Sequence, residues 1–185
     1  PVPRFLYGHS LGGALALGYG LWGTYPPAGI IATAPWLMLT HRTPIWKIIA
    51  ATAISPFWPS LTVSTIEEND RGTGECSSFV GEPRDQLGHR RISLKLFLEF
   101  RASGKRMLKD ASKIHCPSLI IHGSEDEVTD WRASQSFANR ATPNCDFDIW
   151  DGVEHDVHSL HLERLRTRLV QWINSRTCPD RVNRC

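Results

Sequence analysis

The hydrophobic residues of this chain fall into two kinds of segment, which alternate near both ends of the sequence. Short apolar runs bounded by glycine or proline predict buried strands, and longer amphipathic runs predict helices packed against them. The predicted strands cover residues 5–8, 29–35, 118–122 and 147–150. The predicted helices cover residues 11–21, 131–140 and 160–174. Strands that alternate with helices in this way are typical of an α/β fold with a parallel sheet.

The middle of the chain departs from this alternation. Between residues 36 and 106, prolines and short amphipathic pieces replace clean strand–helix pairs. Helices are predicted there at 45–54 and 92–107, and a loop at 73–88. We therefore expect a doubly wound α/β core that carries an inserted, mostly helical cap.

The predicted core is formed by residues 1–35 and 107–176, the cap by 36–106, and a polar tail by 177–185. The first predicted strand follows almost directly on Pro1, yet a buried parallel strand needs neighbours on both edges and helices on both faces. We therefore expect the chain to be the carboxy-terminal portion of a longer protein, without its amino-terminal strands. An amino-terminal targeting segment would lie outside this sequence, so the location stays open, with the cytoplasm or a membrane surface favoured.

Composition and charge narrow the range of partners. With 21 Lys and Arg against 19 Asp and Glu, the 185-residue chain has a formal charge of +2 and no basic patch, which argues against nucleic-acid binding. No apolar run approaches the roughly 18 residues that span a bilayer. Five cysteines are scattered without metal-ligand spacing and predict neither a disulfide framework nor a metal site. A pairing of Cys178 with Cys185 stays open, as does the oligomeric state.

The strongest candidate for chemistry is the pattern Gly8-His9-Ser10-Leu11-Gly12, between a predicted strand and a predicted helix. In this context a serine on a sharp turn presents its hydroxyl above the sheet as a nucleophile, and the flanking glycines remove Cβ atoms that would clash. The plain alternative is a glycine-rich turn that opens a buried helix. The strand and the helix on either side favour Ser10 as a nucleophile.

A nucleophilic serine needs a histidine to accept its proton and a carboxylate to orient that histidine. In folds with this serine turn the partners follow later strands, the carboxylate first, and open α/β sheets build their sites at the carboxyl ends of the strands. The turn after the strand at 118–122 can aim Asp126 back over the sheet, so Asp126 is the predicted carboxylate and Glu125 the alternative. Asp130 is instead predicted to cap the following helix.

The predicted base is His155, which lies in the loop between the last strand and the last helix. His158 and His161 are predicted to lie on that helix itself. His122 ends a buried strand and is predicted to be a core histidine. His9 is expected to pack and hydrogen-bond within the serine turn.

The oxyanion of an acyl-transfer reaction needs two donors. One is expected to be the backbone N–H of Leu11, directly after the nucleophile, and the other normally comes from a loop upstream of the serine strand. We expect that upstream segment to be missing here, and losing one donor lowers the rate by about 100- to 1000-fold. The chain by itself is therefore expected to be poorly active, with its first strand at an open sheet edge.

With these positions assigned, the chain resembles the monoacylglycerol lipase and lysophospholipase branch of the α/β-hydrolases, which includes proteins classed as serine aminopeptidase-like. The residues that carry the resemblance lie at 5–13, 31–35, 117–123 and 150–155, together with Asp126. The resemblance implies a partial α/β-hydrolase fold, with a parallel sheet flanked by helices and an inserted cap. It also implies a triad of Ser10, Asp126 and His155, with no metal and no organic cofactor.

The same resemblance implies a serine hydrolase that cleaves carboxylic esters of glycerolipids, monoacylglycerol or lysophospholipid, through an acyl-enzyme. An apolar, aromatic stretch opens the cap, and Trp36, Leu37 and Trp46 are predicted to contact the lipid. That stretch could also touch a membrane surface, or only pack the cap on the core. The alternatives are a non-catalytic α/β-hydrolase relative that binds a ligand, and a truncated product that is inactive by itself.

Overall fold

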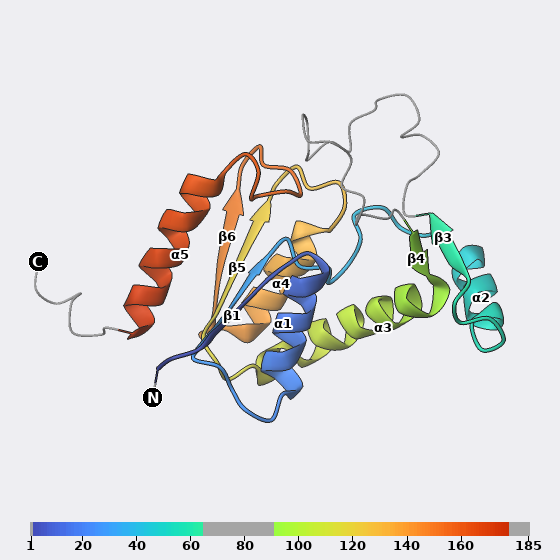
Figure 1. Ribbon diagram of the computed structural model, residues 1–185, viewed down its shortest axis with the longest axis horizontal. Coiled ribbons are helices and arrows are strands. Elements are labelled where there is room, and N and C mark those ends of the chain that lie inside the picture. Colours follow the sequence, from blue (N-terminus) through green and yellow to red (C-terminus); the bar gives the residue numbers. More distant parts are fainter. Residues whose placement is uncertain (1, 65–90, 178–185) are drawn as a thin grey trace, which may run out of the picture. The chain divides into compact units, whose positions relative to one another are not determined.

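The computed structural model describes residues 2–64 and 91–177, and the chain divides into two compact units (Figure 1). The first unit contains residues 1–41 and 103–185, and the second contains residues 42–102. The long helix α3 (Leu94–Asp110) contributes residues to both units.

Among the described residues, the centre of the first unit is a four-stranded parallel sheet with the strand order β1-β2-β5-β6. Its strands are β1 (Phe5–His9), β2 (Gly29–Thr33), β5 (Ser118–Gly123) and β6 (Cys145–Trp150). β2 and β5 are buried throughout, as the apolar residues at their centres favour, and β1 is an edge strand among the described residues. Since all the strands run in one direction, the loops that follow them meet at the same edge of the sheet (Figure 1).

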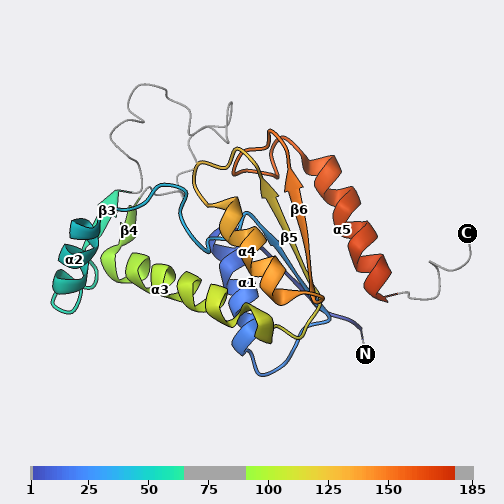
Figure 2. The ribbon, with the colours of Figure 1, turned by 180° about the vertical axis from the view of Figure 1, so that it is seen from behind.

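Helices cover both faces of this sheet (Figure 1 and Figure 2). α1 (Leu11–Trp22) and α4 (Trp131–Ala141) lie on one face, and α5 (Leu162–Thr177) lies on the other. The buried apolar cluster between the sheet and α5 contains Ile31, Leu119, Ile121, Trp150, Val153, Val157, Leu165 and Trp172. The predicted parallel sheet flanked by helices is therefore confirmed.

The second unit contains α2 (Ile45–Ile54), which has the predicted bounds. The structure adds an antiparallel pair that we did not predict, β3 (Thr62–Ser64) with β4 (Arg91–Ser93). Strands of three residues are too short for an alternation of apolar and polar positions to reveal them. α3 begins directly after β4, two residues later than the sequence predicts.

Some expectations fall on residues that the structure does not describe. These are the loop at 73–88, the pair Cys178 and Cys185, and most of the tail at 177–185. The assignment of residues 36–106 to a cap stays a prediction. No helix in the described ranges is both long enough and apolar enough to cross a membrane.

Candidate active site

Ser10 lies in the turn that joins β1 to α1. Its backbone has a φ of 53° and a ψ of −115°, a conformation that residues other than glycine rarely adopt. Such a backbone costs about 1–3 kcal/mol and persists only where its surroundings hold it. The Ser10 N–H donates to the carbonyl of Thr33 at 2.9 Å. The Ser10 carbonyl accepts from the N–H groups of Ala14 at 3.1 Å and Trp36 at 3.0 Å.

Glycines allow α1 to approach β1 closely at this turn. A Cβ on Gly8 would lie 2.2 Å from the carbonyl oxygen of Gly12, and a Cβ on Gly13 would lie 3.1 Å from the carbonyl oxygen of Gly8. A Cβ on Gly12, in contrast, would meet nothing within 4 Å. The expectation that both flanking glycines prevent a clash is therefore right for Gly8 and wrong for Gly12.

Asp126 lies in the loop after β5, and its carboxylate is fully buried. Its Oδ1 accepts from the backbone N–H groups of Val128 and Thr129, each at 2.8 Å, which folds the loop back over the sheet. The hydroxyl of Thr129 donates to Oδ2 at 2.8 Å. Glu125, the alternative carboxylate, is exposed, and Asp130 caps α4 as predicted.

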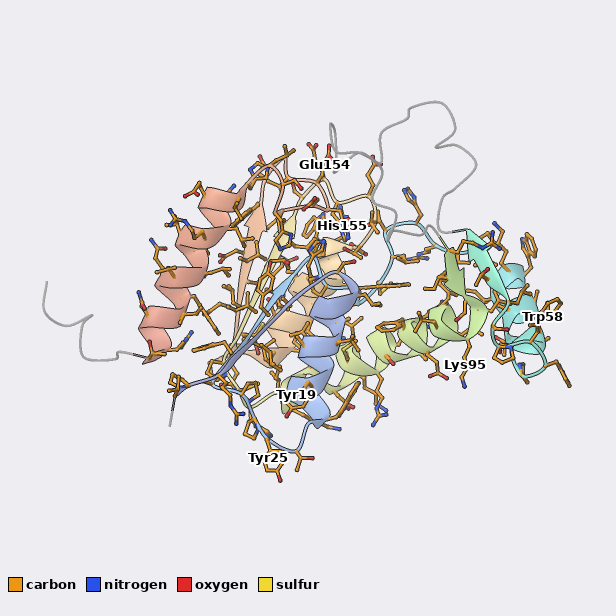
Figure 3. The ribbon with its side chains drawn as sticks, viewed as in Figure 1. Tyr19, Tyr25, Trp58, Lys95, Glu154 and His155 are labelled. Carbon is orange, nitrogen blue, oxygen red and sulfur yellow. The ribbon has the colours of Figure 1, made fainter. Side chains whose placement is uncertain are left out.

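His155 lies in the loop after β6, at the same edge of the sheet (Figure 3). Its Nδ1 lies 2.7 Å from Oδ2 of Asp126, and its Nε2 lies 3.1 Å from Oγ of Ser10. The two loops are joined by a backbone hydrogen bond, in which the N–H of Glu125 donates to the carbonyl of Val153 at 3.0 Å. The structure therefore brings Ser10, His155 and Asp126 into one hydrogen-bonded line.

The three side chains have one consistent protonation pattern. A carboxylate can only accept, so Nδ1 of His155 carries a proton, and in the neutral imidazole Nε2 presents its lone pair to the Ser10 hydroxyl. Burial raises the pKa of Asp126. Hydrogen bonds from His122, His155 and a backbone N–H outweigh burial and hold this pKa well below its ordinary value. Asp126 is therefore ionised at neutral pH and can stabilise a protonated imidazole beside it.

A second histidine also contacts Asp126, and sequence reasoning missed this contact. His122, at the end of β5, is fully buried as predicted, and its Nε2 lies 3.0 Å from Oδ2 of Asp126. Its Nδ1 lies 2.9 Å from Oγ of Ser134 on α4. The available signal was a polar ring at the end of a central strand, four residues before the acid. The spacing alone does not show that the loop returns the carboxylate to that ring.

His9 packs against the candidate base. Its Nδ1 lies 3.1 Å from Oγ1 of Thr33. Its ring centroid lies 4.9 Å from that of His155 and 4.7 Å from that of His158. Burial first, and then the two neighbouring imidazoles, lower the pKa of His9 to about 4, so this ring is neutral at pH 7. No group of three or more His, Cys, Asp or Glu within 2–64 and 91–177 is arranged to hold a metal ion.

The prediction that His158 and His161 lie on the last helix is wrong, because α5 begins at Leu162. Asp156 explains the late start. Its Oδ1 accepts from the backbone N–H of His158 at 3.0 Å and from that of Ser159 at 3.3 Å. These bonds close a turn that the sequence pattern of the helix did not reveal.

Leu11 is the first residue of α1. The start of a helix leaves its first N–H groups without an intrahelical acceptor, so the N–H of Leu11 is available beside Ser10. Free N–H groups next to a nucleophile are the donors that an oxyanion requires. The role of Leu11 as an oxyanion donor stays a prediction.

The three side chains predicted to contact a lipid lie in different surroundings. Leu37 is only 2% exposed, and a Cβ on Gly104 would lie 2.0 Å from its carbonyl oxygen, so Leu37 packs inside the first unit. Trp36 is half-buried next to it, and its backbone N–H bonds to Ser10. Trp46 is 64% exposed on α2, in the second unit. The structure brings Trp36 close to the serine turn and leaves the contact of Trp46 with a substrate as a prediction.

Comparison with known proteins agrees with this fold. The family model described as serine aminopeptidase, S33, matches residues 1–161, which is most of the chain. The chain therefore belongs to the serine aminopeptidase S33 family. The predicted resemblance to the monoacylglycerol lipase branch of the α/β-hydrolases is confirmed by a relative from Schizosaccharomyces pombe.

The protein named "Putative monoglyceride lipase" of Schizosaccharomyces pombe is 32% identical, over 97% of this chain and 50% of that relative. An uncharacterized abhydrolase domain-containing protein of Dictyostelium discoideum is 29% identical, over 95% of this chain and 19% of its own length. The chain thus spans half or less of these two relatives.

The crystal structure of the Paleococcus ferrophilus monoacylglycerol lipase is similar to this fold, with a TM-score of 0.81 at 24% identity. The similarity covers 94% of this chain and 68% of that one. It supports the α/β-hydrolase fold of the first unit.

Proposed function

We propose that this protein is a serine ester hydrolase in which Ser10 is the nucleophile, His155 the general base and acid, and Asp126 the orienting carboxylate. The observation that carries the proposal is the pair of contacts made by His155. Its Nε2 is 3.1 Å from the Ser10 hydroxyl, and its Nδ1 is 2.7 Å from the buried Asp126 carboxylate.

In the first step, Oγ of Ser10 attacks the acyl carbonyl carbon while Nε2 of His155 takes the hydroxyl proton. The carbonyl oxygen becomes an oxyanion, to which the N–H of Leu11 donates, together with a second donor from elsewhere in the protein. The bond to the alkoxy oxygen then breaks, and His155 gives its proton to the leaving alcohol. Asp126 stabilises the imidazolium between these transfers without taking its proton.

In the second step, water attacks the acyl-enzyme. His155 takes a proton from the water and returns a proton to Ser10, and the fatty acid leaves. The starting position of the imidazole is the same in both steps, because Nδ1 stays bonded to Asp126. The strained turn at Ser10 keeps the hydroxyl at the edge of the sheet, where both attacks occur.

The proposed substrates are carboxylic esters of glycerolipids, either monoacylglycerol or lysophospholipid. Two observations support this class. The Schizosaccharomyces pombe relative and the Paleococcus ferrophilus neighbour bear the names of monoglyceride and monoacylglycerol lipases. Large apolar side chains of α2, namely Ile45, Trp46 and Ile49, are each more than 60% exposed (68%, 64% and 62%).

We further propose that residues 36–106 form the cap of the enzyme and that the indoles of Trp36 and Trp46 contact the acyl chain, whereas Leu37 is buried and does not. The exposed apolar side chains of α2 are of the kind that contacts a membrane surface. In this proposal the protein takes the lipid from that surface.

The nucleophile is tested by labelling the full-length protein with a fluorophosphonate probe, with Ser10→Ala as the comparison. We expect labelling of the unsubstituted protein and none of Ser10→Ala. Labelling that survives the substitution excludes Ser10 as the nucleophile. A folded protein that is never labelled, and that binds monoacylglycerol without hydrolysing it, supports a non-catalytic binding protein instead.

The substrate class is tested by hydrolysis of long-chain and short-chain monoacylglycerols, a lysophospholipid and a peptide amide. We expect the highest kcat/KM for one of the two long-chain glycerolipids. Preference for the short-chain ester or for the amide would contradict the proposed class while leaving the serine mechanism in place.

A further inference from the structure

The carboxylate of Asp126 is shared by two histidines. Its Oδ2 accepts hydrogen bonds from Nδ1 of His155 at 2.7 Å and from Nε2 of His122 at 3.0 Å. The two rings differ in their surroundings. The side chain of His155 is 21% exposed at the serine, whereas that of His122 is fully buried.

The proton position on His122 follows from its neighbours. Nε2 faces the hydroxyl of Thr129 at 3.2 Å, which already donates to Asp126. It also faces two other oxygens, Oδ2 of Asp126 at 3.0 Å and the carbonyl oxygen of Thr129 at 3.1 Å. Both oxygens can only accept, so Nε2 carries the proton. When the ring is neutral, its Nδ1 is an acceptor, and the hydroxyl of Ser134, 2.9 Å away, donates to it.

Ser134 keeps the ring of His122 in this tautomer. It lies on α4 and is fully buried, so its hydroxyl has no access to solvent. Each of these buried polar groups would destabilise the folded protein if it lost its hydrogen-bond partner. The hydrogen bonds from Ser134 to His122 and from His122 to Asp126 therefore support one another.

We propose that His122, held by Ser134, is a positioning residue for the reaction, an inference that rests on the proposed function. His122 donates a permanent hydrogen bond from its Nε2–H to Asp126, and this bond orients the carboxylate toward His155. A neutral donor suits this task because it orients the carboxylate without cancelling its charge. A lysine or arginine in the same place would neutralise Asp126 and weaken its stabilisation of the imidazolium of His155.

The test compares His122→Asn with His122→Gln in the full-length protein. Glutamine can place its amide nitrogen near the position of Nε2 and keep the donor to Asp126, whereas asparagine reaches only the position of Nδ1. We expect His122→Asn to lower kcat by about tenfold or more with little change in KM. His122→Gln should recover most of this loss.

A matched pair on α4 tests the role of Ser134. Ser134→Ala removes the hydroxyl that holds Nδ1, and Ser136→Ala removes a hydroxyl from a partly exposed position on the same helix. We expect kcat to fall by a factor of about three to ten for Ser134→Ala and to stay unchanged for Ser136→Ala. A purely structural role predicts lower melting temperatures with unchanged kcat for the folded fraction, and that result would overturn the proposal.

A readout without turnover separates this inference from the proposed function. In ¹H–¹⁵N spectra of the imidazoles, His122 should carry its proton on Nε2, and the hydrogen-bonded Nδ1 proton of His155 should give a downfield resonance. That resonance should persist in His122→Gln and be lost in His122→Asn. A protein that hydrolyses no ester overturns the proposed function, whereas an Nδ1–H tautomer of His122 overturns the positioning role.

Discussion

Nε2 of His155 lies 3.1 Å from Oγ of Ser10, although 145 positions separate the two residues in the sequence. The two residues follow β1 and β6, which lie at opposite edges of the sheet that the described residues form. The contact therefore depends on the register of every strand between them. It also depends on Asp126, which follows the intervening strand β5 and holds the far side of the imidazole.

Replacing Asp126 with Asn should lower kcat for ester hydrolysis by about 10⁴-fold while the fold persists. The amide is neutral and can donate as well as accept, so it neither stabilises the imidazolium nor enforces the Nδ1–H tautomer of His155. Steady-state kinetics of the full-length protein measure the effect. Glu125→Gln is the matched control, because Glu125 is the exposed neighbouring carboxylate, and we expect its kcat to change little. The opposite pattern would assign the orienting role to Glu125.

The two glycines of the serine turn should respond in opposite directions to alanine. Gly8→Ala places a methyl group 2.2 Å from the carbonyl oxygen of Gly12, which should lower the free energy of unfolding by about 3 kcal/mol or more. Gly12→Ala adds a methyl group in open space on a helix, and this should raise the free energy of unfolding by up to about 1 kcal/mol. Urea unfolding with equal m-values measures both. Equal losses for the two variants would contradict the packing described here.

The stability of the protein should fall between pH 6.5 and pH 4 partly because of His9. Its pKa is lowered to about 4 in the folded protein from an ordinary value near 6.5. The unfolded chain therefore binds the proton first as the pH falls, so the contribution of His9 is complete above pH 6.5 and is lost toward pH 4. His9→Asn keeps a donor near Thr33 and does not titrate. Its free energy of unfolding should depend less on pH in this window, and an unchanged slope would show that His9 does not carry the effect.

Trp46→Ser should lower kcat/KM for long-chain monoacylglycerol by about tenfold and leave a short-chain ester unaffected, because only the long acyl chain would bury the indole. Ala53→Ser, a small change at another exposed position on α2, is the control. Equal losses on both substrates would argue against contact between Trp46 and the acyl chain. This outcome would leave the role of Ser10 intact.

Much of the core could be predicted from the sequence because its signals are local. The apolar run at 119–121 favours a buried strand, and α2 has the bounds that its composition indicates. Asp130 caps α4 through its own neighbours on the chain. The order of serine, carboxylate and histidine, each after one of the predicted strands, led to the three side chains that the structure brings together.

Only the tertiary structure decided the features that depend on groups far apart in the chain. It shows that Gly8, and not Gly12, permits the close approach of helix and strand, because that depends on where α1 crosses β1. It pairs β3 with β4, two strands of three residues each that are too short to show an alternation of apolar and polar positions. It also shows the hydrogen bond between His122 and Asp126. A sequence can place a polar ring at the end of a strand, but it cannot show which carboxylate the next loop brings back to that ring.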